Sequence, residues 1–348
     1  MIRSVAPFDL WGLRRKPRSQ VVLYNELLLV QPHHPFWFAL RCLLQGTGRE
    51  RETMIYRDHG VCASAQARSN GDRPEQSIIY LSTQGANNPG SSSESRTPGD
   101  YDIWFRLLER LCIKAGHNYV QRLYTSVGNH QAEIREIFRQ LGFQAYASHI
   151  LLRWSGPSCE PGATPPPMRA QSRRDAWAIH KLYGTVTPPL VQQAEVHSSR
   201  TWMLPRSNRW SRRRSWGWVL GPDDDLRAYL RILSGPLSHV MTLLVHPGVR
   251  EHVPDIVRFG LSHLRDARPV YLLLRDYHQD LLVSVQQPGF QPVGEQVLLV
   301  KNTVVPVRRP LELPALKAGI WDTQVPIPRI SIPREDSQTY ARTTRCHK

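Results

Sequence analysis

The spacing of hydrophobic residues along this 348-residue chain switches between strand-like and helix-like periods, and the same order of periods occurs twice. Runs that alternate every second residue predict strands, whereas apolar residues spaced three and four apart predict helices. The first half shows a hairpin of two strands, then a strand, a helix, a strand, a helix and a strand. The runs that predict them are RETMIYRD, VCASAQARS, SIIYLS, DYDIWFRLLERLCIKAG, VQRLYTSV, HQAEIREIFRQLG and FQAYASHILLRW. Asp100 is predicted to cap the first of these helices, and Gly116 to end it.

The second half repeats this order. Its runs are SWGWVLG, LRAYLRIL, HVMTLLV, PDIVRFGLSHLRDA, PVYLLLRD, HQDLLVSVQQPG and QVLLVKN. In both halves a Gly-Phe pair separates the last helix from the last strand, and the two residues Phe143 and Phe290 lie 147 positions apart (290 − 143). The sequence therefore indicates an internal duplication and predicts two similar mixed sheets.

A proline-rich stretch, SGPSCEPGATPPP, separates the halves. Three consecutive prolines favour an extended, semi-rigid spacer. We therefore predict an N-terminal domain over residues 1–154, a linker over 155–167 and a C-terminal domain over 168–310. Residues 311–348 are predicted to form an extended proline-rich tail with a disordered end. The polar stretch over residues 84–100 is predicted to be a loop inside the first domain.

Charge and cysteine content narrow the class of protein. Lys and Arg number 45 against 29 Asp and Glu, a formal net charge of +16. This surplus favours anionic partners such as nucleic acid, acidic surfaces or a phosphorylated cofactor, without choosing among them. The five cysteines form no CxxC pair and are typical of a reduced, cytoplasmic protein. No apolar run approaches the roughly 18 residues of a membrane span, so no membrane partner is expected.

The order of elements and the Gly-Phe corners resemble the GNAT (GCN5-related N-acetyltransferase) family. The resemblance covers residues 1–154 and 168–309, and the segment LLVHPGVR resembles the family's LxVxPxxR entry to the cofactor loop. It implies a mixed α/β fold of two tandem GNAT-like acyl-CoA N-acyltransferase domains. It also implies acetyl-CoA between the splayed fourth and fifth strands of a domain, a small or peptidic amine as acceptor, and no metal.

The resemblance places the cofactor more readily in the second half than in the first. A helix N-terminus binds phosphate, and glycines let the backbone approach it. Arg250 matches the family's Q/R position, although Val253 and Asp255 stand where glycines are expected, and the first half has no R-x-x-G-x-G motif. The predicted cofactor-binding residues are Leu243, Val245, Arg250, His252, Val253 and Asp255.

The catalytic residues stay unassigned. The family's general acid is a Tyr four residues before the Gly of Gly-Phe, and Phe138 and Val285 occupy these positions here. Neither side chain can transfer a proton. Tyr277 and His278 are alternatives between which the sequence does not choose. Two hypotheses follow: an acyl-CoA-dependent N-acyltransferase, or a non-catalytic protein on the same fold that senses a ligand or binds nucleic acid.

Three further patterns allow a functional and a structural interpretation. The spacing of His239, His246 and His252 fits no common zinc motif, so no metal site is predicted. The triplet Asp223–Asp225 is a general base, an amine-binding patch or an ordinary turn. The segment Arg200–Trp218, with six Arg and four Trp, either binds nucleic acid or is a loop whose Trp side chains pack in the core.

Overall fold

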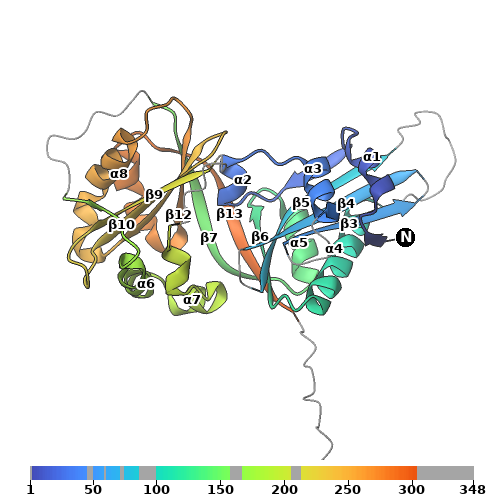
Figure 1. The fold of residues 1–348 in the computed structure, drawn as a ribbon, viewed down its shortest axis with the longest axis horizontal. Helices are drawn as coiled ribbons and strands as arrows, with labels where there is room; N and C mark the ends of the chain where they lie inside the picture. Colours follow the sequence, from blue (N-terminus) through green and yellow to red (C-terminus); the bar gives the residue numbers. More distant parts are fainter. Residues whose placement is uncertain are drawn as a thin grey trace, which may run out of the picture. The chain divides into compact units, whose positions relative to one another are not determined.

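The computed structural model describes residues 2–44, 50–58, 60–70, 74–85, 99–156, 167–204 and 213–303, which all lie in one compact unit, Met1–Pro306. A 13-stranded mixed sheet runs through this unit (Figure 1). The strand order is β1-β3-β4-β5-β6-β13-β7-β12-β11-β10-β9-β8, and β2 pairs with β5 beside this path. Most of the predicted linker and the whole predicted tail lie outside the described residues.

The first half contributes seven strands, five α-helices and one 3-10 helix to the described residues. In chain order these are β1 (Ile2–Ser4), η1 (Pro7–Asp9), α1 (Leu10–Leu13), β2 (Ser19–Val22), α2 (Glu26–Val30), α3 (Pro35–Leu44), β3 (Arg51–Asp58), β4 (Val61–Ser69), β5 (Glu75–Gly85), α4 (Asp100–His117), β6 (Arg122–Gly128), α5 (Ala132–Gln140) and β7 (Gln144–Trp154).

The second half follows the same plan, with β8 as its first strand. Its elements are β8 (Arg169–Ala170), α6 (Asp175–Val186), α7 (Pro189–Glu195), η2 (Ser199–Trp202), β9 (Arg214–Leu220), β10 (Ala228–Ser234), β11 (His239–Val245), η3 (Pro247–His252), α8 (Val253–Ser262), β12 (Val270–Arg275), η4 (Asp276–Leu281), α9 (Leu282–Gln286) and β13 (Gln291–Asn302).

The two Gly-Phe corners have the same conformation. Gly142 and Gly289 have φ values of +81° and +106°, in the left-handed region that favours glycine at the end of a helix. The following residues, Phe143 and Phe290, are buried in the two main cores. The predicted repeat is therefore confirmed at these corners.

The predicted cap of α4 is off by one residue. Gly99 occupies the N-cap position, and Asp100 lies in the first turn, where a negative charge is favourable near the positive end of the helix dipole. The helix continues through Gly116 to His117.

The prediction of two separate sheets is wrong, because the halves exchange their last strands. Strand β13 lies between β6 and β7, with Leu299 opposite Thr125 of β6. Strand β7 in turn pairs with β12, with Leu152 opposite Leu272. A strand that ends a sheet leaves a row of unpaired N–H and C=O groups, and this exchange removes two such edges. The boundaries 1–154 and 168–310 stay a prediction, although the two halves share one sheet.

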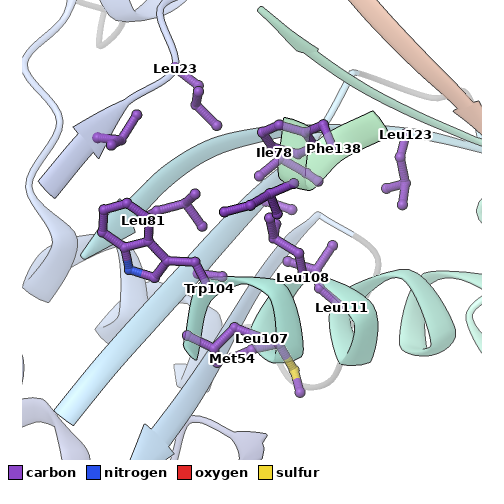
Figure 2. Close-up of a cluster of buried hydrophobic side chains, with 14 of the residues drawn as sticks. Leu23, Met54, Ile78, Leu81, Trp104, Leu107, Leu108, Leu111, Leu123 and Phe138 are labelled. Atoms are coloured by element: carbon purple, nitrogen blue, oxygen red, sulfur yellow. The ribbon is translucent and has the colours of Figure 1, made fainter. Parts of the chain in front are cut away.

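Each half has its own main hydrophobic core. In the first half, α4 and α5 pack on one face of the sheet through side chains that Figure 2 shows converging, among them Trp104, Leu108 and Phe138. In the second half, α8 and α9 pack on β10, β11 and β12. None of the helices within the described residues is both long and apolar enough to cross a membrane. Of the described cysteines, Cys42, Cys62 and Cys112 are free thiols.

Candidate functional site

Each half contains one parallel strand pair that is joined at one end only. Strands β5 and β6 pair over three residues, from Glu75 opposite Arg122 to Ser77 opposite Tyr124. Strands β11 and β12 also pair over three residues, from His239 opposite Val270 to Met241 opposite Leu272. Beyond these positions the two strands of each pair no longer pair with each other, as predicted for the splayed fourth and fifth strands. The two parallel strands of each half therefore splay apart toward their carboxyl ends, and we call the region between them the cleft of that half.

The cleft of the first half is filled by the chain itself. Strand β2 pairs antiparallel with β5, from Ser19 opposite Thr83 to Val22 opposite Tyr80. The Leu23 amide donates to the Ile79 carbonyl at 3.0 Å, which extends this ladder by one residue. On the other side of the cleft, Ser126 of β6 donates its hydroxyl to the Tyr24 carbonyl at 2.5 Å. The backbone edge of β5 that the splay opens is thus already hydrogen-bonded to residues 19–23.

The surroundings of this first cleft also disfavour a phosphate group. The first turn of α4 carries Asp100, which pairs with Arg18 at 2.8 Å, and Asp102. A hollow of about 580 Å³ between α4 and α5 is lined in part by Asp102, Glu133 and Glu136. Residues 86–98 of the predicted loop lie outside the described residues. Carboxylates at the start of α4 offset the attraction that a helix N-terminus exerts on a diphosphate.

The cleft of the second half has an open strand edge. In the described part of the chain, β11 beyond Met241 pairs with β10 alone. Leu243 is half-buried at this edge, while Leu244 and Val245 are buried. The β12-facing backbone groups of residues 242–245 are therefore available to a ligand that lies in the cleft. This is the main structural difference between the two halves.

The other predicted cofactor residues lie around the start of α8. Arg250 forms an ion pair with Asp280 of η4 at 2.8 Å, and both side chains are about two-fifths exposed (44% and 41%). His252 occupies the N-cap position of α8 and makes no side-chain cap bond. The Val253 amide donates to the Arg250 carbonyl and Pro254 has no N–H, which leaves the Asp255 amide as the remaining N–H of the first three helical residues. Val253 is fully buried in the core, and Asp255 pairs with Arg258 at 2.9 Å. The structure thus brings Arg250 and His252 to the helix N-terminus and turns Val253 away from it.

The structure distinguishes His278 from its neighbours at the carboxyl end of β12. His278 is 5% exposed. Burial lowers the pKa of His278, and the positive charges of Arg250 and Arg275 lower it further. The negative charge of Asp280 and a hydrogen bond with the Val186 backbone act in the opposite direction. His278 therefore interacts with both Arg250, at the start of α8, and Arg275, at the end of β12. The imidazole is neutral at pH 7 and can accept a proton.

A buried ionic cluster, which no sequence pattern predicts, lies next to His278. Arg275, the last residue of β12, donates to Glu195 at the end of α7 at 2.6 Å. The Tyr183 hydroxyl donates to the same carboxylate at 2.8 Å, and His197 lies 3.2 Å from it. Burial by itself would raise the pKa of Glu195, but Arg275, His197 and Tyr183 lower it to about 2. The cluster joins α6, α7 and β12 through charges that are 80 residues apart in sequence.

Two buried polar atoms near this cluster have no hydrogen-bond partner among the described residues. They are Nη1 of Arg275 and Nδ1 of His149, whose residues lie opposite each other on β12 and β7. The other ring nitrogen of His149 lies 3.0 Å from the side-chain oxygen of Gln296. Burial, followed by the charge of Arg275, lowers the pKa of His149 to about 4. A neutral His149 and the Arg275 guanidinium thus offer an acceptor and a donor side by side.

The positions of the family's usual acid hold no proton donor. Phe138 and Val285 are both fully buried in the two main cores. Neither side chain can transfer a proton, so a general acid or base of this protein lies elsewhere.

The remaining predicted patterns have structural roles in the described residues. His239 contacts Asp266, His246 accepts from the Gly248 amide, and His252 lies beside Glu251. No group of three or more His, Cys, Asp or Glu side chains within the described ranges could hold a metal ion. Asp223 and Asp225 are exposed turn residues that pair with Arg169 and Arg227.

The segment Arg200–Trp218 is described only in part, since residues 205–212 lie outside the described ranges. Trp202 and Trp218 are buried, at 6% and 8% exposure, in two different cores. Trp216 is 38% exposed. Two of its aromatic side chains therefore pack as core residues, and nothing in the described part supports nucleic-acid binding.

Comparisons with known proteins found similarity to solved structures alone. No family model and no curated protein matches the sequence. The chain is similar to the solved structure of a tandem GNAT protein from the clavulanic acid biosynthesis pathway, determined without acetyl-CoA, at 13% identity and a TM-score of 0.49, over 88% of this chain and 99% of that one. It is also similar to a GCN5-related N-acetyltransferase from Sphaerobacter thermophilus, at 14% identity and a TM-score of 0.45, over 88% and 96%. We base the function on the clefts themselves.

Proposed function

We propose that this protein is an acyl-CoA-dependent N-acyltransferase that binds one acyl-CoA per chain, in the cleft of its second half. The observation that supports this assignment is the contrast between the two splayed strand pairs. The edge of β5 is occupied by β2, whereas β11 beyond Met241 pairs with β10 alone among the described residues. The first half would then have a structural role.

The residues around the second cleft fit the parts of an acyl-CoA molecule. The pantetheine arm contains amides, which would hydrogen-bond to the open backbone edge of Leu243–Val245. The diphosphate would lie at the N-terminus of α8, where the positive end of the helix dipole attracts anions. Arg250 would leave its partly exposed pair with Asp280 for the stronger charge of the diphosphate. Acetyl-CoA is the donor that we propose to test first.

His278 is our candidate for the base. In the reaction, an amine nitrogen forms a bond to the thioester carbon, and the bond from that carbon to sulfur breaks. The attacking amine loses a proton, and the neutral imidazole of His278 would accept it. Arg275 and His149 would contact polar groups of the acceptor amine, since each has one buried nitrogen without a partner. No residue of the described cleft is assigned as the acid that protonates the leaving thiolate.

Calorimetric titration with CoA and acetyl-CoA tests the binding site. We expect one molecule bound per chain, and two per chain would contradict the filled first cleft. Thiol release from acetyl-CoA, with and without a panel of amines, tests the chemistry. We expect slow release, because a missing general acid typically costs about 10²–10⁴-fold in rate.

The variant His278→Gln and the control His263→Gln, at an exposed position near the end of α8, separate a base from a bystander. His278→Gln should lower the rate of thiol release with little change in CoA affinity, and the control should leave both unchanged. Binding without turnover would instead favour a non-catalytic ligand sensor on the same fold. Absence of CoA binding would refute both proposals.

A further inference from the structure

A second surface of the molecule, far from the cleft in sequence, exposes an unusual number of large apolar side chains. Helices α1 and α3 lie next to each other (Figure 1). They cover a small core that includes Leu13, Ala39 and Cys42. On their outer side, Trp11 is 72% exposed and Trp37 is 58% exposed. We call the surface formed by η1, α1 and the outer side of α3 the N-terminal aromatic surface.

Two more apolar side chains extend this surface. Leu44 is 77% exposed and follows Trp37 by seven residues on α3, which places both on the same side of the helix. Phe8 of η1 is 58% exposed, with the Arg3 guanidinium 4.5 Å from the centre of its ring. Scattered single apolar residues are normal on a protein surface, but a group of them on adjoining helices marks an interaction site.

An arginine ties the aromatic rings of α1 and α3 together. The guanidinium carbon of Arg14 lies 5.5 Å from the ring centre of Trp11 and 5.5 Å from that of Phe36. The rings of Phe36 and Trp37 lie 5.3 Å apart at an interplanar angle of 80°. These contacts hold the rings in place, although Trp11 and Trp37 are largely exposed to water.

The charges beside the rings are positive. Arg14, Arg15 and Lys16 are consecutive and exposed, and none of them makes an ion pair within the described part of the chain. The neighbouring acid, Asp9, has a fully buried carboxylate that pairs with Arg3. An apolar surface bordered by uncompensated cations complements a partner that is apolar inside and anionic outside.

We propose that the N-terminal aromatic surface binds the surface of a membrane that contains anionic phospholipids. Its Trp, Phe and Leu side chains would enter the boundary between headgroups and acyl chains, and Arg14, Arg15 and Lys16 would contact lipid phosphates. The surface does not fit nucleic acid as well, because Phe36 and Trp37 are nearly perpendicular and Leu44 offers no ring for a base to stack on. This is peripheral binding, distinct from a membrane span, and it is independent of the proposed acyl transfer.

Co-sedimentation of the full-length chain with vesicles tests this proposal. One set of vesicles contains phosphatidylcholine alone, and the other contains phosphatidylcholine with phosphatidylglycerol. We expect binding to the second set only, weakened by added salt. The double variant Trp11→Ala/Trp37→Ala should bind at least about tenfold more weakly, since each ring would be withdrawn from water on binding.

The second half offers a matched control. Trp177 and Leu190 are 67% and 75% exposed on α6 and α7, so Trp177→Ala/Leu190→Ala removes a similar apolar area from another surface. This control should bind like the natural chain, and both double variants should keep its thermal unfolding midpoint. Failure of the natural chain to bind phosphatidylglycerol vesicles would overturn the proposal, as would an equal loss in the control. Tight binding of a single-stranded oligonucleotide that only the Trp11/Trp37 variant loses, without vesicle binding, would assign this surface to nucleic acid instead.

Discussion

Replacing Glu195 by Gln should destabilise the protein by about 3 kcal/mol at pH 7. The structure lowers the pKa of this carboxyl from 4.5 to about 2, and such a difference between the folded and unfolded states corresponds to about 3 kcal/mol. The side chain is only 6% exposed, so solvent screening reduces the value little. Removing one partner of a buried ion pair typically costs about 3–5 kcal/mol, which is of the same size.

The pH dependence of this loss identifies its cause. A carboxyl whose pKa is lower in the folded state stabilises the protein fully above its unfolded pKa of about 4.5. That contribution disappears as the pH falls from about 4.5 to about 2. The difference in the free energy of unfolding between the natural chain and Glu195→Gln should therefore be constant from pH 7 to about 5 and shrink below that. Urea unfolding at pH 7, 5, 4 and 3 measures it.

Glu136 provides a control in which the pKa of a carboxyl is lowered although its side chain is not buried. Hydrogen bonds from Arg139 and Gln140 lower the pKa of Glu136 to about 2 as well, but its side chain is 44% exposed. Glu136→Gln should change stability little, because exposed ion pairs contribute little. Arg275→Met, added to Glu195→Gln, should recover part of the loss by removing the unpaired charge. A loss for Glu195→Gln equal to that for Glu136→Gln, or independent of pH, would refute this reasoning.

Four further predictions concern the proposed site and the basic segment. Arg250→Glu should weaken CoA binding by at least about 1.5–3 kcal/mol, because it removes a contact to phosphate. Arg265→Glu, past the other end of α8, should have little effect. Calorimetry of both variants distinguishes a direct phosphate contact from an effect of the overall positive charge. Val285→Tyr should cost about 1–3 kcal/mol of stability, since Val285 is fully buried in the core, and it should not raise the rate of thiol release. A faster variant would show that the cleft accepts the family's usual acid. Because burial lowers the pKa of His278, thiol release should stay constant as the pH falls through 6.5 and decline only below it; a decline already above pH 6.5 would exclude His278 as the base. The segment Arg200–Trp218 should bind single-stranded oligonucleotides weakly and with strong salt dependence, and tight binding in high salt would contradict its assignment as a packed loop.

The elements that depend on local chemistry were predictable from the order of the amino acids alone. The short, mostly apolar run HVMTLLV predicted β11 with the bounds that the structure has, and the two hairpin runs predicted β3 and β4. The glycines of both Gly-Phe corners were predictable because a positive φ is costly for other residues. The splayed strand pairs followed from the resemblance to a known order of elements. Each of these features depends either on residues within about ten positions of one another, or on a pattern that the chain repeats.

How the halves are joined and which cleft is open became clear only from the folded chain. Alternation predicts that β7 and β13 are strands, but it carries no information about neighbours, so the strand exchange was not predictable. The four residues of β2 are too short a run to be recognised as a strand, yet they fill the first cleft. Glu195 and Arg275 become partners only because α7 packs beside the end of β12. Backbone pairing and buried charge pairs are contacts between distant segments, and their energy depends on a geometry that exists only after folding.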